Sequence, residues 1–233
     1  MKNKMFNISE MLWRLSYFLL RRFKVGVIHL YDHKVVDDKQ FLDLVYRLRD
    51  EGKTLQNIWE LYNLFKGVLQ TAKVAGDIVE LGVYKGGSAK LICEIKGDRV
   101  FHLFDTFEGM PQSGESDTIK EGAFSDVTIE EVKEYLSGYK NVFLYKGLFP
   151  ETAEAIKNRK ISFLHLDVDL YKSTLDALQF FYPLMSSGGI IISHDYNSKS
   201  CPGVRKAFDE FFKDKPEPII ELSGVTQCLV TKF

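Results

Sequence analysis

The segment from Asp77 to Ser88, DIVELGVYKGGS, constrains the fold of this chain more than any other part of the sequence. Its apolar residues form the continuous run expected of a strand that is buried on both faces of a parallel sheet. Glycines follow where the backbone must turn sharply or approach a ligand, and a helical pattern begins directly after them. The segment therefore predicts a strand, a glycine-rich turn and a helix that together bind a cofactor.

A carboxylate interrupts the apolar run. Because Glu80 is costly to bury without a partner, we expect it to meet a hydroxyl or ammonium group of a ligand. Ser88 is the predicted cap of the helix, which we expect to begin at Ala89. The G-x-G-x-x-G order of dinucleotide-binding proteins is absent, which favours a nucleoside cofactor without a pyrophosphate, such as S-adenosylmethionine. An ordinary glycine turn between strand and helix is the alternative.

Length, charge and cysteine usage limit the class of protein. The 233 residues suit one α/β domain with a helical addition. The 31 basic and 32 acidic residues nearly cancel, which argues against a nucleic-acid substrate. The cysteines are odd in number and lie in apolar surroundings, which indicates core thiols in a reducing compartment, and we expect a cytoplasmic protein. They are Cys93, Cys201 and Cys228.

The N-terminal part reads as helical. Residues 11–24 mix apolar, aromatic and basic side chains in a stretch too short to span a bilayer, with no signal-peptide cleavage site after it. We expect this helix to dock on its own domain, and contact with a membrane surface or a partner subunit is the alternative. Residues 38–74 show helical spacing with a break at Gly52. The predicted core residues of this region are Leu42, Val45, Leu48, Leu55, Ile58, Leu61, Leu64 and Leu69.

Strand-like and helix-like patterns alternate through the rest of the chain, which predicts a mostly parallel sheet with helices on both faces. The predicted strands are 78–83, 100–105, 142–145, 161–167 and 190–193. Residues 218–232 read as two further strands whose turn is too short for a crossover helix, so this pair must be antiparallel. We therefore predict an N-terminal helical addition over 1–74 and, over 75–233, the methyltransferase version of the doubly wound α/β fold.

Further candidate residues follow the second and third predicted strands. Asp105 ends the second strand, where an acidic side chain would meet ribose hydroxyls in this architecture. The alternative is a cap on the following turn. Residues 108–126 form a long polar stretch that leaves the ligand-binding edge, so we expect a lid over the cofactor. Gly147 follows the third strand, and we expect it to let the backbone approach the adenine of the cofactor. A plain turn is the alternative. His102, inside the second strand, is predicted to be a hydrogen-bonded core residue.

Polar side chains also end the fourth and fifth predicted strands. Period-two alternation places His165 and Asp167 on one face, with the carboxylate at the carboxyl end and the histidine deeper in the core. The next strand delivers His194 and Asp195 to the same edge. Two carboxylates and an imidazole suit a divalent ion, and a hydrogen-bonded polar cluster is the alternative.

The chemistry of methyl transfer from a sulfonium favours a metal site over a hydrogen-bonded polar cluster. This in-line displacement needs an aligned oxygen nucleophile, and an aliphatic hydroxyl is a poor nucleophile while it keeps its proton. A metal bound through both oxygens of a vicinal diol would lower the pKa of that hydroxyl and fix its direction. Asp167 would then receive the proton.

Four segments of the sequence resemble the macrocin O-methyltransferase (TylF) family. They are ELGVYKGGS, FDTFEGMP, LDVDLYKST and GGIIISHDY with the following GVRKAFDEFF. The resemblance spans roughly residues 77–212, and several unusual motifs occur in the family's order. It implies a class I methyltransferase fold that uses S-adenosylmethionine and magnesium to methylate sugar hydroxyls on antibiotics and related glycosides, usually as a homo-oligomer.

The resemblance also implies residue roles. Around the cofactor it implies Glu80, Gly82, Gly86, Gly87, Ser88 and Asp105. To these cofactor-binding residues we add Tyr84, Thr106 and Gly147 from the same strand ends. Asp167, His194 and Asp195 would hold the metal, and Asp167 or Asp169 would act as the base. The best-described members carry paired aspartates where this chain has His194 and Asp195. A neutral imidazole removes one negative charge, which weakens magnesium relative to manganese or another transition ion, and we expect Mg²⁺ or Mn²⁺.

We therefore expect an S-adenosylmethionine-dependent, divalent-metal-assisted O-methyltransferase that acts on a hydroxyl of a sugar or glycoside. One alternative is a metal-independent methyltransferase of a small phenol or acid. Another is a non-catalytic binding module that uses the basic N-terminal helix. The acceptor stays open, because substrate pockets on such folds are built from variable loops and additions.

Overall fold

The computed structural model describes residues 38–233. The chain divides into two compact units, Met1–Asp43 and Leu44–Phe233, and the second contains the sheet. The predicted basic helix over residues 11–24 lies outside the described residues. Within 38–233, no helix is long and apolar enough to cross a membrane. The second unit takes in residues well before 75, and the division predicted at residues 74 and 75 stays a prediction.

Seven strands form one mixed sheet in the order β3-β2-β1-β4-β5-β7-β6. The five parallel strands are β1 (Asp77–Leu81), β2 (Phe101–Asp105), β3 (Val142–Lys146), β4 (Ile161–Leu166) and β5 (Met185–Ser193). The C-terminal strands are β6 (Ile220–Glu221) and β7 (Cys228–Thr231), and β7 runs antiparallel to both of its neighbours. The structure thus confirms the predicted parallel sheet with an antiparallel C-terminal hairpin, although β5 begins five residues before the predicted start at 190.

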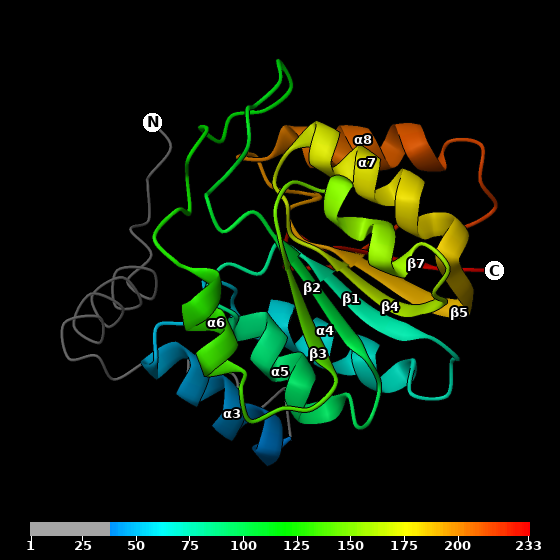
Figure 1. The fold of residues 1–233 in the computed structure, drawn as a ribbon. Helices are drawn as coiled ribbons and strands as arrows, with labels where there is room; N and C mark the ends of the chain where they lie inside the picture. The colour runs from blue at the N-terminus through cyan, green and yellow to red at the C-terminus, as the bar shows by residue number, and fades with distance from the viewer. Residues whose placement is uncertain (1–37) are drawn as a thin grey trace, which may run out of the picture. The chain divides into compact units, whose positions relative to one another are not determined.

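Helices cover both faces of this sheet (Figure 1). On one face lie α7 (Tyr171–Phe181) and α8 (Pro202–Phe212), and on the other lie α4 (Ile58–Gln70) and α5 (Gly87–Ile95). The remaining described helical segments are α3 (Lys39–Asp50), α6 (Ile129–Tyr135), η1 (Glu151–Ile156) and η2 (Tyr182–Leu184). Strands β1 and β4 are buried along their whole length, as expected for strands covered on both sides.

The helical N-terminal region follows the predicted pattern with two exceptions. Its break falls at Gly52, because α3 ends at Asp50 and α4 begins at Ile58. Leu55 and Leu69 were predicted to lie in the core, and both predictions are wrong, since these side chains are 75% and 40% exposed. Leu55 lies in the loop between the helices, where helical spacing carries no information. Leu69 is one residue beyond the buried stripe of α4.

Two helix starts are fixed by reciprocal capping. Thr128 accepts a hydrogen bond from the backbone N–H of Glu131, and the Glu131 carboxylate accepts one from the backbone N–H of Thr128 in return, so the two residues form a capping box at the start of α6. Asn57 and Glu60 form the same arrangement at the start of α4. The predicted cap of α5 is wrong. That helix begins at Gly87, and Ser88 lies within its first turn.

Candidate active site

A cavity of about 210 Å³ opens at the carboxyl edge of the parallel strands. The residues predicted to form the site and found in its lining are Gly82, Tyr84, Gly87, Ser88, Asp105, Thr106, Gly147, Asp167, Asp169, His194 and Asp195. Of the predicted set, Glu80 and Gly86 do not line it. The sheet topology thus brings residues from the ends of all five parallel strands to one place, as expected for open α/β sheets, in which ligands bind at the carboxyl ends of the strands.

Gly82 sets the spacing between the ends of β1 and β4. Its backbone has a φ of +89°, and a Cβ atom there would lie 1.9 Å from the carbonyl oxygen of Asp167. No side chain can occupy that position without moving one strand end away from the other. Gly86, also at positive φ, is the N-cap residue of α5 and does not line the cavity.

Glu80 finds its partner inside the protein. Its Oε1 lies 2.9 Å from Nδ1 of His165, and both side chains are fully buried. Burial raises the pKa of Glu80, against the effect of the hydrogen bonds from His165 and Ser88. Because Ser88 lines the cavity, it connects this buried pair to the site. The imidazole thus takes the place of the ligand group expected beside Glu80, and its direct contact with a cofactor stays a prediction.

Asp105 holds the glycine turn in place. Its Oδ2 accepts hydrogen bonds from the backbone N–H groups of Val83 (2.7 Å) and Tyr84 (2.9 Å), and its Oδ1 accepts one from Phe107 (2.8 Å). The predicted alternative, a cap on the following turn, is therefore confirmed. The side chain also lines the cavity, and its contact with a ribose stays a prediction. His102 is hydrogen-bonded to Asp77 and Tyr145 in the core, as predicted.

The polar loop between β2 and α6 borders the cavity. Gly109, Met110, Pro111 and Phe124 from this loop belong to the lining. Asp117 attaches the loop to the start of α7, where its Oδ1 accepts a hydrogen bond from the backbone N–H of Tyr171 (2.8 Å). This position fits the expected lid.

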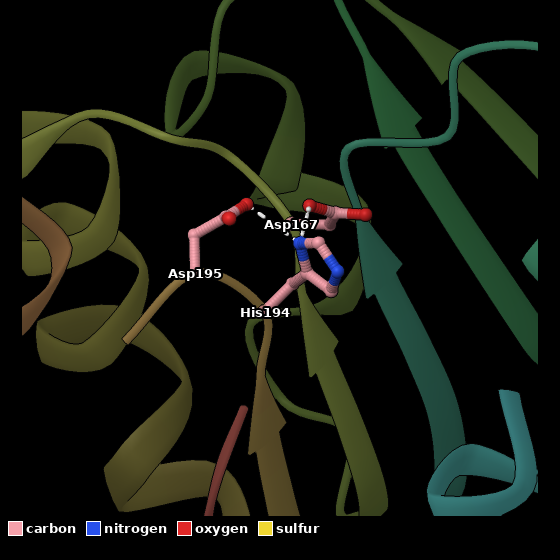
Figure 2. Close-up of side chains that lie close together, drawn as sticks. All are labelled: Asp167, His194 and Asp195. Atoms are coloured by element: carbon pink, nitrogen blue, oxygen red, sulfur yellow. Dashed lines mark hydrogen bonds and ion pairs between the residues drawn. The ribbon is translucent and has the colours of Figure 1, made fainter. Parts of the chain in front are cut away.

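Three polar side chains meet where β4 and β5 end (Figure 2). Nδ1 of His194 lies 2.6 Å from Oδ2 of Asp195 and 3.2 Å from Oδ1 of Asp167. Burial disfavours the charged imidazole, but the Asp167 charge and the hydrogen bonds of Asp167, Asp195 and Glu60 outweigh it and hold the pKa of His194 above its usual range. The pKa of Asp167 is correspondingly held low, because the charge and hydrogen bond of His194 outweigh burial.

This cluster fits a divalent cation. Asp167, His194 and Asp195 each offer a ligand atom, and these atoms all lie within 4.8 Å of one another. Two carboxylates beside one imidazole nitrogen create a negative potential that attracts a divalent cation. Sequence reasoning thus predicted three side chains that the fold does bring together.

Sequence reasoning missed two residues that contact this cluster, Gln56 just before α4 and Glu60 in its first turn. Oε2 of Glu60 lies 3.3 Å from Nε2 of His194. Nε2 of Gln56 donates a hydrogen bond to Oδ2 of Asp167 (2.9 Å). The N-x-x-E pattern of Asn57 and Glu60 signals a helix start, but nothing in the sequence indicates that this helix start faces the ends of β4 and β5.

Asp169 lies beside the cluster in a left-handed backbone conformation, with a φ of +57°. Burial, the charge of Asp167 and a hydrogen bond with Asp195 raise the pKa of Asp169 to about 8. The Sγ atom of Cys201 is 3.6 Å from its Oδ1. Cys201 is a buried free thiol, as are Cys93 and Cys228, which confirms the prediction of core cysteines.

Residues 53–226 match the family model of the macrocin O-methyltransferases (TylF). Demethyldecarbamoylnovobiocin O-methyltransferase of Streptomyces niveus is 31% identical over 197 residues, which cover 72% of this chain and 74% of that protein. The 8-demethyl-8-(2,3-dimethoxy-alpha-L-rhamnosyl)-tetracenomycin-C 4'-O-methyltransferase of Streptomyces olivaceus is 32% identical over 145 residues, 55% of this chain and 56% of that protein.

Solved structures agree with these matches. The O-methyltransferase NovP superposes with a TM-score of 0.67 at 29% identity, over 77% of this chain and 82% of its own. The calicheamicin methyltransferase CalS11 superposes with a TM-score of 0.69 at 19% identity, over 84% and 94%, and at that identity shows the fold alone. The relatives are O-methyltransferases, which sets aside the alternative of a non-catalytic binding module. This chain belongs to the macrocin O-methyltransferase (TylF) family and is an S-adenosylmethionine-dependent O-methyltransferase.

Proposed function

We propose that this enzyme transfers a methyl group from S-adenosylmethionine to a hydroxyl of a sugar or glycoside, with the assistance of a divalent metal ion. The observation that carries the proposal is the meeting of Asp167, His194 and Asp195 at a cavity that the glycine turn also lines. A cofactor held by the turn and a cation held by the cluster would share one cavity. That proximity is what in-line transfer requires.

The cofactor would lie between the glycine turn and the end of β2. Gly82, Tyr84, Gly87, Ser88, Asp105, Thr106 and Gly147 line this part of the cavity. Gly87 and Ser88, the first two residues of α5, line the cavity. The partial positive charge at the N-terminus of a helix favours a carboxylate there. These features suit the amino-acid part and the ribose of S-adenosylmethionine.

Asp167, His194 and Asp195, the metal-ligand cluster, would orient the acceptor. When bound, a divalent cation lowers the pKa of a hydroxyl that it ligates. Asp167 and Asp195 supply the negative charge that retains a cation, and His194 supplies a neutral nitrogen once its Nδ1 proton is displaced. Manganese is the expected ion, because an imidazole ligand suits a transition ion better than magnesium.

Asp169 is the better placed of the two candidate bases. Its side chain lines the cavity, whereas the two carboxylate oxygens of Asp167 already face Nδ1 of His194 and Nε2 of Gln56. Asp167 is then a metal ligand, and Asp169 would take the proton from the acceptor hydroxyl.

The sugar acceptor is supported by the relatives. The name of the Streptomyces olivaceus relative includes a rhamnosyl group, which is a sugar, as part of its substrate. An acceptor with adjacent hydroxyls also matches a site built to ligate a cation, since two oxygens on one ring can bind it together. Homo-oligomer formation and residence in the cytoplasm complete the proposal. Three buried free thiols support a reducing compartment.

Binding measurements test the proposal before the acceptor is known. S-adenosylhomocysteine at about 100 times its Kd should stabilise the native enzyme by about 2.7 kcal/mol. Titration of the chelator-treated enzyme with Mn²⁺ should reveal one site, which Asp195→Ala removes while binding of S-adenosylhomocysteine persists. Turnover with a panel of glycosides should then require added metal. A wild-type enzyme that binds S-adenosylhomocysteine but methylates a phenol or acid equally well after chelation would instead support the metal-independent alternative.

A further inference from the structure

We propose that Gln56 is a positioning residue of this site, which orients the carboxylate of Asp167 and offers one hydrogen-bond acceptor to a donor group of the bound ligand. The inference rests on the proposed function, because it assigns Gln56 a role toward the metal ligand Asp167 and toward the occupant of the cavity. None of the motifs named in the sequence analysis includes this residue.

The first observation is the hydrogen bond between Gln56 and Asp167. Gln56 lines the cavity but is only 7% exposed, and its Nε2 lies 2.9 Å from Oδ2 of Asp167. The other carboxylate oxygen, Oδ1, faces Nδ1 of His194 at 3.2 Å. Each oxygen of Asp167 therefore has its own partner, which fixes the rotation of the carboxylate and directs Oδ1 toward His194.

The second observation is that the backbone around Gln56 is held in place. Its N–H donates to Oγ1 of Thr54 (3.1 Å), and the next residue, Asn57, is the N-cap of α4. Glu60 closes the capping box by accepting a hydrogen bond from the N–H of Asn57 (2.8 Å), and the same oxygen lies 3.3 Å from His194. The start of α4 thus contacts two of the three candidate metal ligands.

The third observation concerns the other end of the Gln56 amide. The NH₂ group must face Asp167, because the reverse orientation would place the amide oxygen against a carboxylate oxygen. Oε1 is then buried, and among the residues that the structure describes it has no hydrogen-bond partner. Leaving such an acceptor unsatisfied costs about 1–3 kcal/mol, so a donor from the ligand would recover this free energy.

The chemistry of Oε1 limits what can bind there. A lone amide oxygen accepts from an N–H or an O–H and repels a carboxylate. The cavity would receive two such donors under the proposed function, namely the ammonium group of the cofactor's amino-acid part and a hydroxyl of the acceptor. The shared chemistry is a hydrogen-bond donor beside Asp167, and the two sources are separated by experiment.

Gln56→Met tests the proposal, since methionine keeps the length of the side chain and removes both polar groups. Gln56→Asn is the second variant, because it keeps an amide that is too short to reach Asp167. Gln70→Met is the matched control, since Gln70 is exposed at the end of α4. Thermal unfolding of each variant establishes that it is folded before ligands are compared.

Four titrations of the full chain form the readout. The Kd for Mn²⁺, measured without cofactor, should rise about three- to tenfold in both Gln56 variants and stay unchanged in the control. The Kd for S-adenosylhomocysteine should rise about tenfold if the ammonium is the donor, while that for 5'-methylthioadenosine, which lacks the amino-acid part, stays unchanged. If the hydroxyl is the donor, weaker binding appears instead with methyl α-L-rhamnopyranoside added to enzyme, S-adenosylhomocysteine and Mn²⁺.

Two results would overturn the inference. Folded Gln56 variants that bind all four probes with wild-type affinity would show that neither contact matters. Equal weakening of S-adenosylhomocysteine and 5'-methylthioadenosine would point to general damage to the cavity. Both results leave the proposed function intact, because wild-type binding is unaffected. A wild-type enzyme that binds neither Mn²⁺ nor S-adenosylhomocysteine would instead overturn the proposed function and this inference with it.

Discussion

Oε2 of Glu60 lies 3.3 Å from Nε2 of His194, the ring nitrogen opposite the one that faces Asp167 and Asp195. A carboxylate at this position favours a proton on Nε2 and leaves Nδ1 as the nitrogen available to a metal. Metal-binding histidines commonly have such a partner, and its removal typically weakens metal affinity 10- to 100-fold. The start of α4 therefore contributes to the site without supplying a metal ligand.

Glu60→Gln should weaken Mn²⁺ binding by roughly tenfold or more, because the amide no longer fixes the tautomer of His194. Calorimetric titration of the chelator-treated enzyme measures this effect. Glu130→Gln, at an exposed position in the first turn of α6, is the control and should bind Mn²⁺ like the wild type. Equal affinity in Glu60→Gln and the control would exclude a role for Glu60 in metal binding.

His194→Asp should shift the metal preference toward magnesium. The substitution places two carboxylates side by side at the end of β5 and adds a negative charge, and Mg²⁺ prefers oxygen ligands. The quantity to compare is the ratio of the Mg²⁺ and Mn²⁺ dissociation constants, measured for the wild type and the variant under the same conditions. An unchanged ratio would mean that His194 is not a ligand.

Gly82→Ala should destabilise the fold strongly, because the new Cβ would lie 1.9 Å from the carbonyl oxygen of Asp167 at a φ of +89°. We expect a loss of about 3 kcal/mol or more, or no folded protein, since both a backbone clash and left-handed strain contribute. Gly97→Ala is matched in backbone conformation, with a φ of +61°, but has open space around it. It should lose only about 1 kcal/mol. Urea unfolding of the two variants separates the clash from the strain.

Glu217 should make stability depend on pH in the acid range. Burial opposes its ionisation, but hydrogen bonds from Lys232 (2.6 Å) and Tyr182 (2.8 Å) outweigh burial and lower the pKa of Glu217 to about 2. A carboxyl whose pKa is lower in the folded state stabilises the protein above the unfolded value of 4.5, and this stabilisation is lost as the pH falls toward about 2.

Glu217→Gln should therefore lose about 2 kcal/mol of unfolding free energy at neutral pH, and the difference from the wild type should shrink as the pH falls below about 4.5. Denaturant unfolding between pH 3 and pH 7, roughly, measures both effects. Glu221→Gln removes an exposed ion pair with Arg205 and should change stability by less than about 1 kcal/mol at any pH. A constant difference for Glu217→Gln across this range would contradict the assignment.

Local sequence patterns determined much of this protein. The apolar runs placed the strands, because strands covered on both faces must be apolar along their length, as β1 and β4 are. The short C-terminal turn required an antiparallel hairpin, and Asp167, His194 and Asp195 were assigned to one edge because parallel strands end together. These inferences depend only on chain direction and side-chain alternation, which a sequence contains.

Tertiary structure decided which polar groups meet. Glu80 faces His165 because β1 and β4 are neighbours in register, and Gln56 and Glu60 reach the metal-ligand cluster because α4 packs at the ends of β4 and β5. Leu55, apolar and at helical spacing, is exposed because it lies in a loop. Contacts between residues 85 or more positions apart depend on packing of the whole chain, and no local pattern in this sequence specifies them.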